Sequence, residues 1–342
     1  MSSFRDILLK LCRHENLTRE ESHEAFLHMM SGEATDAQIG GFLVGLAAKG
    51  STVDELVGAV SVMREKSLTL PVDGVGVVLD TCGTGGSAVR ARGIFNISTT
   101  AAIIAAGAGV KVAKHGNRSA SSKSGSADVL EALGVKLELT PDRLRTCIEE
   151  ANICFAFARS HHPAMRHVAP ARTTLGIPTI FNMIGPLSSP AKVKHQLLGV
   201  FAAELTERFA NVLRELGSTR AWVVYAEDGL DELSTMAPTR VSELADGQVK
   251  TWTLDADLLD LPVAKVEDLQ VSNATESAAA IREVLSGKKG PKRDISLLNA
   301  AAALVVAEQC DALQDGLELA AKAVDSGAAA RTLDTLVRLS NS

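Results

Sequence analysis

Apolar residues are spaced in two different ways along the chain, and the change falls near residue 70. Between residues 4 and 11 they recur at helical spacing, every three or four positions. Thr18, with a glutamate three residues later, forms a capping box, and Thr35 and Thr52 begin two more helices. Residues 1–70 show no strand pattern and no obvious chemistry, so we predict a small all-helical domain that serves packing or subunit association.

Beyond a link at residues 70–74, short apolar runs alternate with helical segments. Strands are predicted at residues 75–80, 110–113, 154–158, 196–201 and 221–225, and helices at 98–107, 126–133 and 204–216, with another beginning at Thr140. Asp246-Gly247, inside the alternating stretch 240–254, predicts a hairpin, and the C-terminal part of the chain is helical and rich in alanine. This order predicts an α/β domain with a central, mainly parallel sheet flanked by helices.

Composition argues against several classes of function. The chain has a net charge of -6 and a sequence pI near 5.8, and aromatic residues make up only 4% of it, which argues against general nucleic-acid binding. Five cysteines without paired spacing are typical of reduced cytoplasmic thiols and give no zinc motif. No apolar run approaches the roughly 18–20 residues of a membrane span. We therefore expect a cytoplasmic protein with neither nucleic-acid nor membrane partners.

The stretch between Asp80 and Asp128 departs from the overall acidity. It contains no acidic residue, but six cations and eight glycines. Residues 83–86 and 114–118 follow predicted strands, where ligands bind in open α/β sheets, and residues 96–99 begin a predicted helix. Glycine lets backbone N–H groups approach an anion closely, so we predict a phosphate site here. The alternative is a buried turn region of an α/β fold with a few solvated lysines.

Two further stretches have unusual charge. Residues 151–203 contain no acid and four of the eight histidines; within them we expect two short helices around a bend at 161–172 and a turn at 181–187. Residues 227–232 instead hold four carboxylates directly after a predicted strand. Such a group suits a hard cation such as Mg²⁺, which proteins hold through one or two carboxylates and substrate phosphates. A solvated acidic loop explains the same pattern equally well.

Several of these motifs together carry a family resemblance. GTGG at Gly83, NIST at Asn96, KHGNR at Lys114, SSKSGSADVLEALG at Ser121 and GPL at Gly185 occur in the order expected of one family. With Arg172 and the Asp231–Glu232 pair, they make the chain resemble the anthranilate phosphoribosyltransferases, within the nucleoside phosphorylase/phosphoribosyltransferase fold family, from the N-terminal helices to about residue 330.

The resemblance implies an architecture and a reaction. It implies a helical domain of residues 1–70, with a second piece at about 165–190, and a phosphoribosyl-binding α/β domain in the rest of 71–342. The implied reaction transfers phosphoribose from 5-phosphoribosyl 1-pyrophosphate (PRPP) to the amine of anthranilate, with Mg²⁺, in tryptophan biosynthesis. A homodimer through the helical domain is implied as well.

The resemblance also implies roles for individual residues. PRPP would be held by Gly83, Thr84, Gly85, Gly86, Ser87, Asn96, Ile97, Ser98, Thr99, Lys114, Asn117, Arg118, Ser119, Ser121, Ser122 and Ser126. Anthranilate would contact Gly83, His115, Asn117, Arg172 and Gly185, and Mg²⁺ would be held by Ser98, Asp231 and Glu232. An Arg172 fork can pair with the acceptor carboxylate, and His115 either takes a proton or positions the acceptor.

One loop departs from the family pattern. Residues 87–95 form a longer link than usual between GTGG and NIST, and Ser87 stands where the family has an acidic residue. Arg90 and Arg92, inside this loop, either bind pyrophosphate directly or are solvated. The sequence favours neither alternative.

Four other functions fit parts of the sequence. Gly83-x-Gly85-x-x-Ala88 matches a dinucleotide fingerprint, but the acidic residue expected about 20 positions later is missing. A pyrimidine nucleoside phosphorylase shares the implied architecture, although KHGNR and the Asp-Glu pair favour the anthranilate enzyme. A non-catalytic nucleic-acid-binding relative and a paralogue with another aromatic acceptor also remain open.

Overall fold

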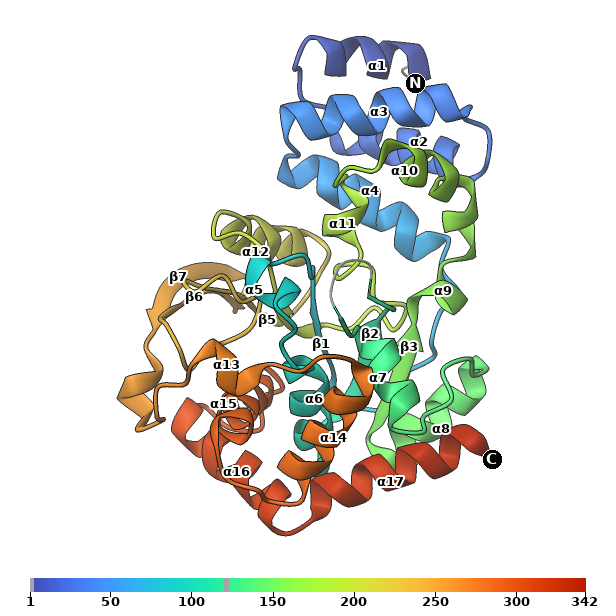
Figure 1. Cartoon of the computed structure of the whole chain (residues 1–342). Helices are drawn as coiled ribbons and strands as arrows, with labels where there is room; N and C mark the ends of the chain where they lie inside the picture. Colours follow the sequence, from blue (N-terminus) through green and yellow to red (C-terminus); the bar gives the residue numbers. More distant parts are fainter. Residues whose placement is uncertain (1–2, 120–122) are drawn as a thin grey trace.

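The computed structural model describes residues 3–119 and 123–342, with a helical bundle at one end of the molecule and an α/β domain at the other (Figure 1). The bundle begins with α1 (Phe4–Cys12), α2 (Arg19–Met30), α3 (Asp36–Lys49) and α4 (Val53–Glu65). The hydroxyls of Thr18, Thr35 and Thr52 each accept the N–H three residues later, which confirms the predicted helix starts. Within the described residues, no helix has both the length and the apolar composition to cross a membrane.

A later part of the chain returns to this bundle. The helices α10 (Ala169–Leu175) and α11 (Phe181–Ile184) pack against α3 and α4 (Figure 1). The ring of Phe26 lies 5.6 Å from that of Phe42 and 5.5 Å from that of Phe181 between centroids, in the buried centre of the bundle. The predicted turn at 181–187 is thus partly wrong, because its first residues form α11, started by the side chain of Asn182 accepting the N–H of Thr179.

The second domain is built on one seven-stranded sheet. Its strands are β1 (Val78–Gly83), β2 (Lys111–Gly116), β3 (Ile153–Phe157), β4 (His195–Gly199), β5 (Arg220–Ala226), β6 (Thr239–Ala245) and β7 (Gln248–Leu254). Their spatial order is β3-β2-β1-β4-β5-β6-β7, and the first five are parallel, which confirms the predicted mainly parallel sheet. β6 and β7 form the predicted hairpin, with positive φ at Asp246 and Gly247.

Two strands differ from their predicted bounds in a way that matters for the site. The first strand begins at Val78 rather than residue 75, because Gly74 and Gly76 have positive φ and interrupt the extended backbone. The second continues to Gly116, so Lys114 and His115 lie within the strand rather than after it. The apolar residues from which the strand was predicted end at residue 113, but the strand continues through Lys114 and His115, two polar residues whose side chains are buried.

The sheet separates two buried cores, and neighbouring residues of β4 and β5 point into different ones. Leu198 and Val223 lie in a core shared with the bundle and with α12 (Leu205–Glu215), whereas Leu197 and Val224 lie in the other. The second core contains α6 (Ile97–Gly107) and α15 (Pro291–Val306). Further helices are α5 (Ala88–Ala91), α7 (Ser126–Ala132), α8 (Pro141–Ala151), α9 (Ala158–His161), α13 (Val266–Leu269), α14 (Ala274–Leu285), α16 (Leu313–Asp325) and α17 (Ala328–Asn341), with 3₁₀ turns at Pro163–His167 and Ala256–Leu259.

The connections between the two domains are hydrogen-bonded to one another. The N–H of Leu68 donates to the carbonyl of His161 at 2.8 Å, and that of Leu70 donates to the carbonyl of Pro190 at 3.1 Å. Arg64, in the last turn of α4, donates from Nε to the carbonyl of Leu187 at 3.0 Å. The chain passes between the domains three times, and these hydrogen bonds join the three connecting segments into one junction.

Candidate active site

The carboxyl ends of the parallel strands meet at one edge of the sheet, and Asp231 lies against two of them. Gly83 of β1 is paired with Gly199 of β4. A Cβ atom at Gly199 would lie 1.7 Å from the carbonyl oxygen of Asp231, and one at Gly83 would lie 2.9 Å from its Oδ2. The N–H of Gly85 donates to the same Oδ2 at 3.1 Å. Both glycines are required for this close approach, which brings the GTGG loop and a predicted metal residue together.

The loop that carries Asp231 is held from both sides. Asp228 accepts the N–H of Leu230 at 2.8 Å, so this carboxylate stabilises the turn. On the other side, Asn299 of α15 accepts the N–H of Leu233 at 3.0 Å and donates to its carbonyl at 2.8 Å. Of the four carboxylates in the acidic stretch, Asp231 and Glu232 are the two that are buried.

These two carboxylates fit Mg²⁺ better than a metal with an all-protein ligand set. No cluster of three or more His, Cys, Asp or Glu side chains capable of holding a metal occurs in residues 3–119 and 123–342. Mg²⁺ is commonly held by one or two carboxylates together with phosphate oxygens and water. The buried Asp231–Glu232 pair at the sheet edge matches that donor set.

Lys114 provides a buried cation beside the start of α6. Its side chain is 2% exposed, and Nζ donates to the carbonyl of Thr81. Nζ also lies 3.4 Å from Oγ of Ser98, in the first turn of α6. In the described part of the chain, the side chain of Asn96 makes no cap hydrogen bond to that helix, whose N-terminal end carries the partial positive charge that favours anions.

Two hydroxyls in the predicted phosphate site have unused hydrogen-bonding capacity. Among the described residues, the buried Oγ1 atoms of Thr84 and Thr99 have no hydrogen-bond partner. A buried hydroxyl without a partner is costly unless a ligand or water satisfies it. This corner of the site is therefore suited to a polar ligand such as a phosphate.

Two other predicted PRPP residues face the protein interior. The side-chain Oδ1 of Asn96 accepts hydrogen bonds from Oγ of Ser124 at 3.0 Å and of Ser277 at 2.7 Å. Ile97 is a core residue. Their side chains hold the start of α6 in place, and their assignment to PRPP stays a prediction.

The loop after KHGNR is tied to α7 by one carboxylate. Asp128 Oδ2 accepts the N–H groups of Ser119 at 3.0 Å and Gly125 at 2.9 Å. Arg118 forms ion pairs with Asp128 and with Glu131, at 3.0 Å and 2.8 Å. Two carboxylates thus balance the charge of Arg118 in this structure, and its assignment to PRPP stays a prediction.

Ser126 and Asn117, two other predicted residues, contact each other at the ends of this loop. Oγ of Ser126 lies 3.5 Å from the carbonyl of Asn117, whose Oδ1 accepts the N–H of Arg118 at 2.8 Å. Ser121 and Ser122 lie outside the described residues. The loop is thus defined at both ends, where the side chains of Asn117 and Asp128 accept backbone N–H groups.

His115 pairs with a second histidine. Its Nε2 lies 3.3 Å from Nε2 of His162, and both side chains are buried. Burial is the main cause that lowers the pKa of His115 well below its usual range and that of His162 to about 4. Both rings are therefore neutral near pH 7. Because neighbouring strand residues point to opposite faces, Lys114 meets α6 while His115 meets the segment that follows α9.

Arg172 is held by an aromatic ring rather than by an acid. Its guanidinium carbon lies 4.9 Å from the centre of the Phe181 ring, and the side chain is half-buried. In the part of the chain that the structure describes, no carboxylate pairs with it. Burial lowers the pKa of Arg172, although the group stays charged at neutral pH. A stacked guanidinium keeps its in-plane N–H groups available for a carboxylate.

The GPL turn is anchored to the sheet. The carbonyl of Pro186 accepts hydrogen bonds from Nε2 of Gln196 at 2.7 Å and from Sγ of Cys82 at 3.5 Å. Gly185, which precedes it, has open space where a Cβ would be, with only the carbonyl of Phe181 at 3.8 Å. The sheet therefore fixes the position of the turn that contains Gly185, a residue predicted to contact anthranilate.

The atypical loop at residues 87–95 is docked on a distant segment. The N–H of Phe95 donates to the carbonyl of Leu269 at 3.0 Å, and the carbonyl of Gly93 accepts the N–H of Val271 at 2.7 Å. Arg92 forms an ion pair with Glu267 at 3.3 Å, and both side chains are more than half exposed. This geometry corresponds to the solvated alternative for Arg92. Ser87 is buried, and the side chain of Arg90 lies outside the described part.

Sequence reasoning missed several residues that support the site. Gly199 could have been recognised as a glycine within the strand predicted at residues 196–201, near the edge where ligands bind. Asn299 is a lone amide in the otherwise apolar stretch 297–306, which signals a buried hydrogen-bonding role. His162 gave no such signal, because its partner His115 is 47 positions away in the sequence.

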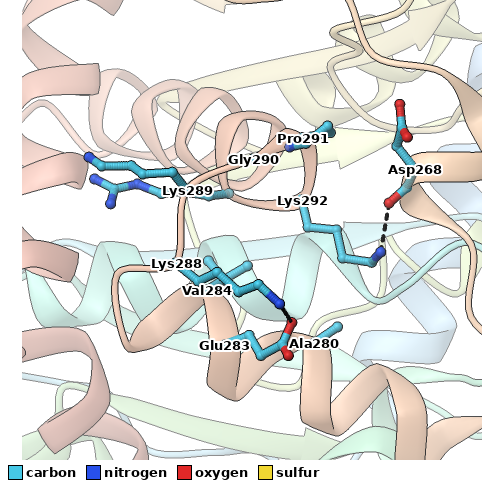
Figure 2. A pocket seen from close by; sticks show the side chains of 10 residues that line it. Asp268, Ala280, Glu283, Val284, Lys288, Lys289, Gly290, Pro291 and Lys292 are labelled. Carbon is cyan, nitrogen blue, oxygen red and sulfur yellow. Dashed lines mark hydrogen bonds and ion pairs between the residues drawn. The ribbon is translucent and has the colours of Figure 1, made fainter.

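A separate pocket lies at the N-terminus of α15 (Figure 2). It has a volume of about 140 Å³, and none of the predicted site residues lines it. Its cations are already engaged: Lys288 pairs with Glu283 at 2.9 Å, and Lys292 donates to the carbonyl of Asp268 at 2.6 Å (Figure 2). The pocket therefore differs from the sheet edge, where the buried hydroxyls of Thr84 and Thr99 have no hydrogen-bond partner among the described residues.

Comparison with protein families covers most of the chain. Residues 75–330 match the glycosyl transferase family, a/b domain, and residues 5–67 match the glycosyl transferase family, helical bundle domain. An anthranilate phosphoribosyltransferase from Methylobacterium nodulans is 51% identical over 341 residues, covering 100% of both chains. One from Afipia carboxidovorans is 52% identical over 342 residues, covering 99% of both.

The solved structures that resemble this chain are also anthranilate phosphoribosyltransferases. The anthranilate phosphoribosyltransferase of Thermus thermophilus superposes with a TM-score of 0.91 at 40% identity, over 98% of this chain and 100% of that one. The Saccharomyces cerevisiae enzyme in complex with PRPP and Mg has a TM-score of 0.88 at 26% identity, over 99% and 98% of the two chains. A complex of the yeast enzyme with 4-fluoroanthranilate has a TM-score of 0.85 at 26% identity, over 99% of both.

Proposed function

The chain belongs to the anthranilate phosphoribosyltransferase family, and from that membership we propose that it transfers the phosphoribosyl group of PRPP to the amine of anthranilate. The products are N-(5-phosphoribosyl)anthranilate and pyrophosphate, and the reaction belongs to tryptophan biosynthesis. The observation that carries the proposal is the contact between the GTGG loop and Asp231, made at the strand ends where an α/β sheet binds ligands.

The PRPP side of the site is proposed to use backbone N–H groups, hydroxyls and one buried cation. Lys114 and the positive end of α6 supply positive charge, and Ser98 supplies a hydroxyl beside Lys114. Among the described residues, Thr84 and Thr99 add hydroxyls without hydrogen-bond partners. Negative charge develops on the departing pyrophosphate, and preorganised donors and cations stabilise it. The reaction needs positioning and exclusion of water more than it needs a covalent intermediate.

Mg²⁺ is the proposed cofactor. Ser98, Asp231 and Glu232 would hold it, in agreement with the buried carboxylate pair and with the yeast relative crystallised with PRPP and Mg. A bound ion of this kind supplies charge stabilisation to the leaving pyrophosphate. The protein's own contribution is the rigid loop, fixed by Asp228 and Asn299, that keeps the two carboxylates in place.

The acceptor side is proposed to lie between the sheet edge and the bundle. Arg172, stacked on Phe181, is a half-buried cation suited to the carboxylate of anthranilate. Gly185 has only the carbonyl of Phe181, at 3.8 Å, near the position of a Cβ, while His115 lies in β2 and Asn117 directly follows that strand. The neutral state of His115 suits either proton acceptance or positioning of the amine.

The proposal extends to assembly and surroundings. We propose a homodimer through the helical domain, because Leu9 of α1 and Val44 of α3 are large apolar residues that are 41% and 43% exposed. The five free thiols suit a reducing compartment, so we propose that the enzyme works in the cytoplasm. Movement of the bundle about the junction would close the site around both substrates.

One assay tests the proposed function directly. Loss of anthranilate fluorescence is followed with PRPP and Mg²⁺, with EDTA and PRPP omission as controls. We expect turnover with anthranilate that is abolished by either control. Turnover of a substituted anthranilate but not of anthranilate would identify a different acceptor, and phosphorolysis of uridine or thymidine would identify a phosphorylase. A protein that catalyses none of these reactions would also contradict the proposal.

A further inference from the structure

A groove lies at the edge of the sheet opposite to the candidate active site. It has a volume of about 890 Å³ and is lined by Val78 and His195, the first residues of the parallel strands β1 and β4, and by Thr219, which precedes β5. None of the described residues that line it is predicted to hold PRPP, anthranilate or Mg²⁺. Small-molecule sites commonly have volumes of about 300–1,000 Å³, so this groove is large enough for a ligand of its own.

Hydrogen bonds hold both sides of the groove in place. One side is the linker that follows α4, where the N–H of Leu70 donates to the carbonyl of Pro190 at 3.1 Å. The other is the segment that leads into β4, where the carbonyl of Lys194 accepts the N–H of Thr219 at 2.8 Å. The shape of the groove is therefore set by the folded backbone and needs no ligand to form it.

Most of the lining is apolar. Val77, which directly precedes β1, is 39% exposed. A single exposed valine is ordinary, but here it lies in a concave surface with other apolar residues, so an apolar ligand would remove several of them from water together. These residues are Leu70, Val72, Val77, Val78, Ala191 and Val193.

Two lysines line the same groove without a partner of opposite charge. Lys192 and Lys194 are exposed, and neither side chain makes an ion pair or hydrogen bond with a residue that the structure describes. Lys192 has a φ of 48°, in the left-handed region that glycine and asparagine adopt more readily than lysine. Asp73 is the only acid among the described residues that line the groove, so the two lysines outnumber it.

His195 adds a buried polar group with unused hydrogen-bonding capacity. The residue is 7% exposed, and its buried Nε2 atom makes no hydrogen bond with a described residue. Nε2 lies 3.4 Å from Oε2 of Glu308, but Glu308 also pairs with Arg220 at 3.7 Å. Buried polar side chains are usually hydrogen-bonded, so this end of the groove suits a ligand that carries a polar group.

We propose that this groove binds a small apolar carboxylate, with its apolar part on the surface around Val77 and its carboxylate beside Lys192 and Lys194. Ammonium groups form charge-assisted hydrogen bonds with a carboxylate, and the valine-rich lining favours an apolar body. A purely polar anion such as phosphate would leave that lining in water. The groove is separate from the proposed transferase site, so the proposal stands whether or not the chain transfers phosphoribose. The occupant would contact the linker after α4 and the segment before β4, which both belong to the junction between the domains.

Calorimetric titration of the wild-type protein with octanoate tests the site. Octanoate has both a carboxylate and an apolar chain, whereas octan-1-ol lacks the charge and acetate lacks the chain. We expect one octanoate per chain, bound at least about 10-fold more tightly than octan-1-ol or acetate, because each of these loses one of the two kinds of contact. Acetate or inorganic phosphate bound as tightly as octanoate would show a site for charge alone and overturn the proposal.

Substitutions in the groove locate the bound octanoate. Lys192→Asn suits the left-handed backbone, and Lys194→Gln removes the second charge. Because both lysines are exposed, each substitution should raise the Kd for octanoate by up to about 5-fold, and the double variant should raise it about 10-fold or more. Val77→Glu places a carboxylate on the exposed apolar surface and should weaken binding at least as much as the double variant. Lys250→Gln, at an exposed lysine of β7, and Arg172→Ala, in the proposed acceptor site, serve as controls and should bind octanoate like the wild type.

Three results would contradict the assignment to this groove. Octanoate affinity that is unchanged in the double lysine variant and in Val77→Glu would place the ligand elsewhere. Loss of binding in Arg172→Ala would place octanoate in the proposed acceptor site. A change in the oligomeric state of Val77→Glu, measured by sedimentation velocity, would mean that a second copy of the chain covers the groove.

Discussion

The buried carboxylate of Asp80 accepts the backbone N–H of His115, with 2.9 Å between Oδ1 and the nitrogen. The strands β1 and β2 pair through Val78 with Lys111 and Leu79 with Val112. The bond from Asp80 therefore continues their connection toward the site, one residue beyond the paired part of β1 and three beyond that of β2. Lys114 supplies the nearby positive charge. A fully buried acid thus holds the strand that carries both Lys114 and His115.

Asp80 predicts a specific dependence of stability on pH. Burial raises its pKa from 3.8 to about 6, so the folded protein binds a proton more readily than the unfolded chain between these values. Stability from this group is present at low pH and is lost as the pH rises through about 6, by about 3 kcal/mol in total. In Asp80→Asn, which keeps an acceptor for His115, that loss should disappear. Urea unfolding at pH 4 to 7 measures the difference, and identical pH slopes for the two proteins would contradict it.

Gly199 is predicted to be essential for the position of Asp231. The methyl group of Gly199→Ala would fall 1.7 Å from the carbonyl oxygen of Asp231, so the acidic loop must move. A displacement of about 1 Å at a reacting site can reduce rates about 100-fold, and we expect a loss of that order in kcat/KM for PRPP. Steady-state kinetics at saturating anthranilate measures it.

Gly40 offers a matched control for that substitution. It lies within α3, and a Cβ there meets nothing within 4 Å. Gly40→Ala should leave the kinetics unchanged and stabilise the protein by about 0.5–1 kcal/mol, because alanine is the better helix former. If both alanine variants had wild-type activity, the close contact of Gly199 with Asp231 would not matter for catalysis.

Arg172 is expected to set the affinity for the acceptor. Removing a charge-assisted hydrogen bond costs roughly 1.5–3 kcal/mol, so Arg172→Ala should raise the KM for anthranilate about 10- to 100-fold while the KM for PRPP stays constant. Arg172→Lys keeps the charge but not the planar fork, and should fall between. Arg166→Ala, in the same acid-free stretch but exposed, serves as the control. An unchanged anthranilate KM in Arg172→Ala would remove the residue from the acceptor site.

Much of the fold follows from local patterns. The hydroxyl caps at Thr18, Thr35 and Thr52 act within one helical turn, and the Asp246-Gly247 hairpin needs only two residues with positive φ. Such signals are contained in a few neighbouring positions. They predict the elements well, and their alternation predicts the parallel sheet.

The details of the site depend on contacts between distant positions. The buried state of Lys114 and His115, which lengthens β2, depends on partners such as Ser98 and His162 that sequence spacing does not connect. Likewise, the ion pairs of Arg118 with residues of α7 explain why a predicted phosphate cation is already balanced. The sequence therefore allowed these residues to be chosen as site candidates, whereas the partners of each side chain could be identified only in the folded structure.

Arg92 provides a prediction for the atypical loop at residues 87–95. Its ion pair with Glu267 is exposed on both sides, and such pairs contribute at most about 1 kcal/mol. We therefore expect Arg92→Ala to keep the wild-type KM for PRPP and nearly all of the wild-type stability, with Glu267→Gln as the matched control. Kinetics and thermal unfolding check this at low and high salt. A several-fold rise of the PRPP KM in Arg92→Ala, but not in Glu267→Gln, would mean that Arg92 leaves Glu267 to bind pyrophosphate when the substrate arrives.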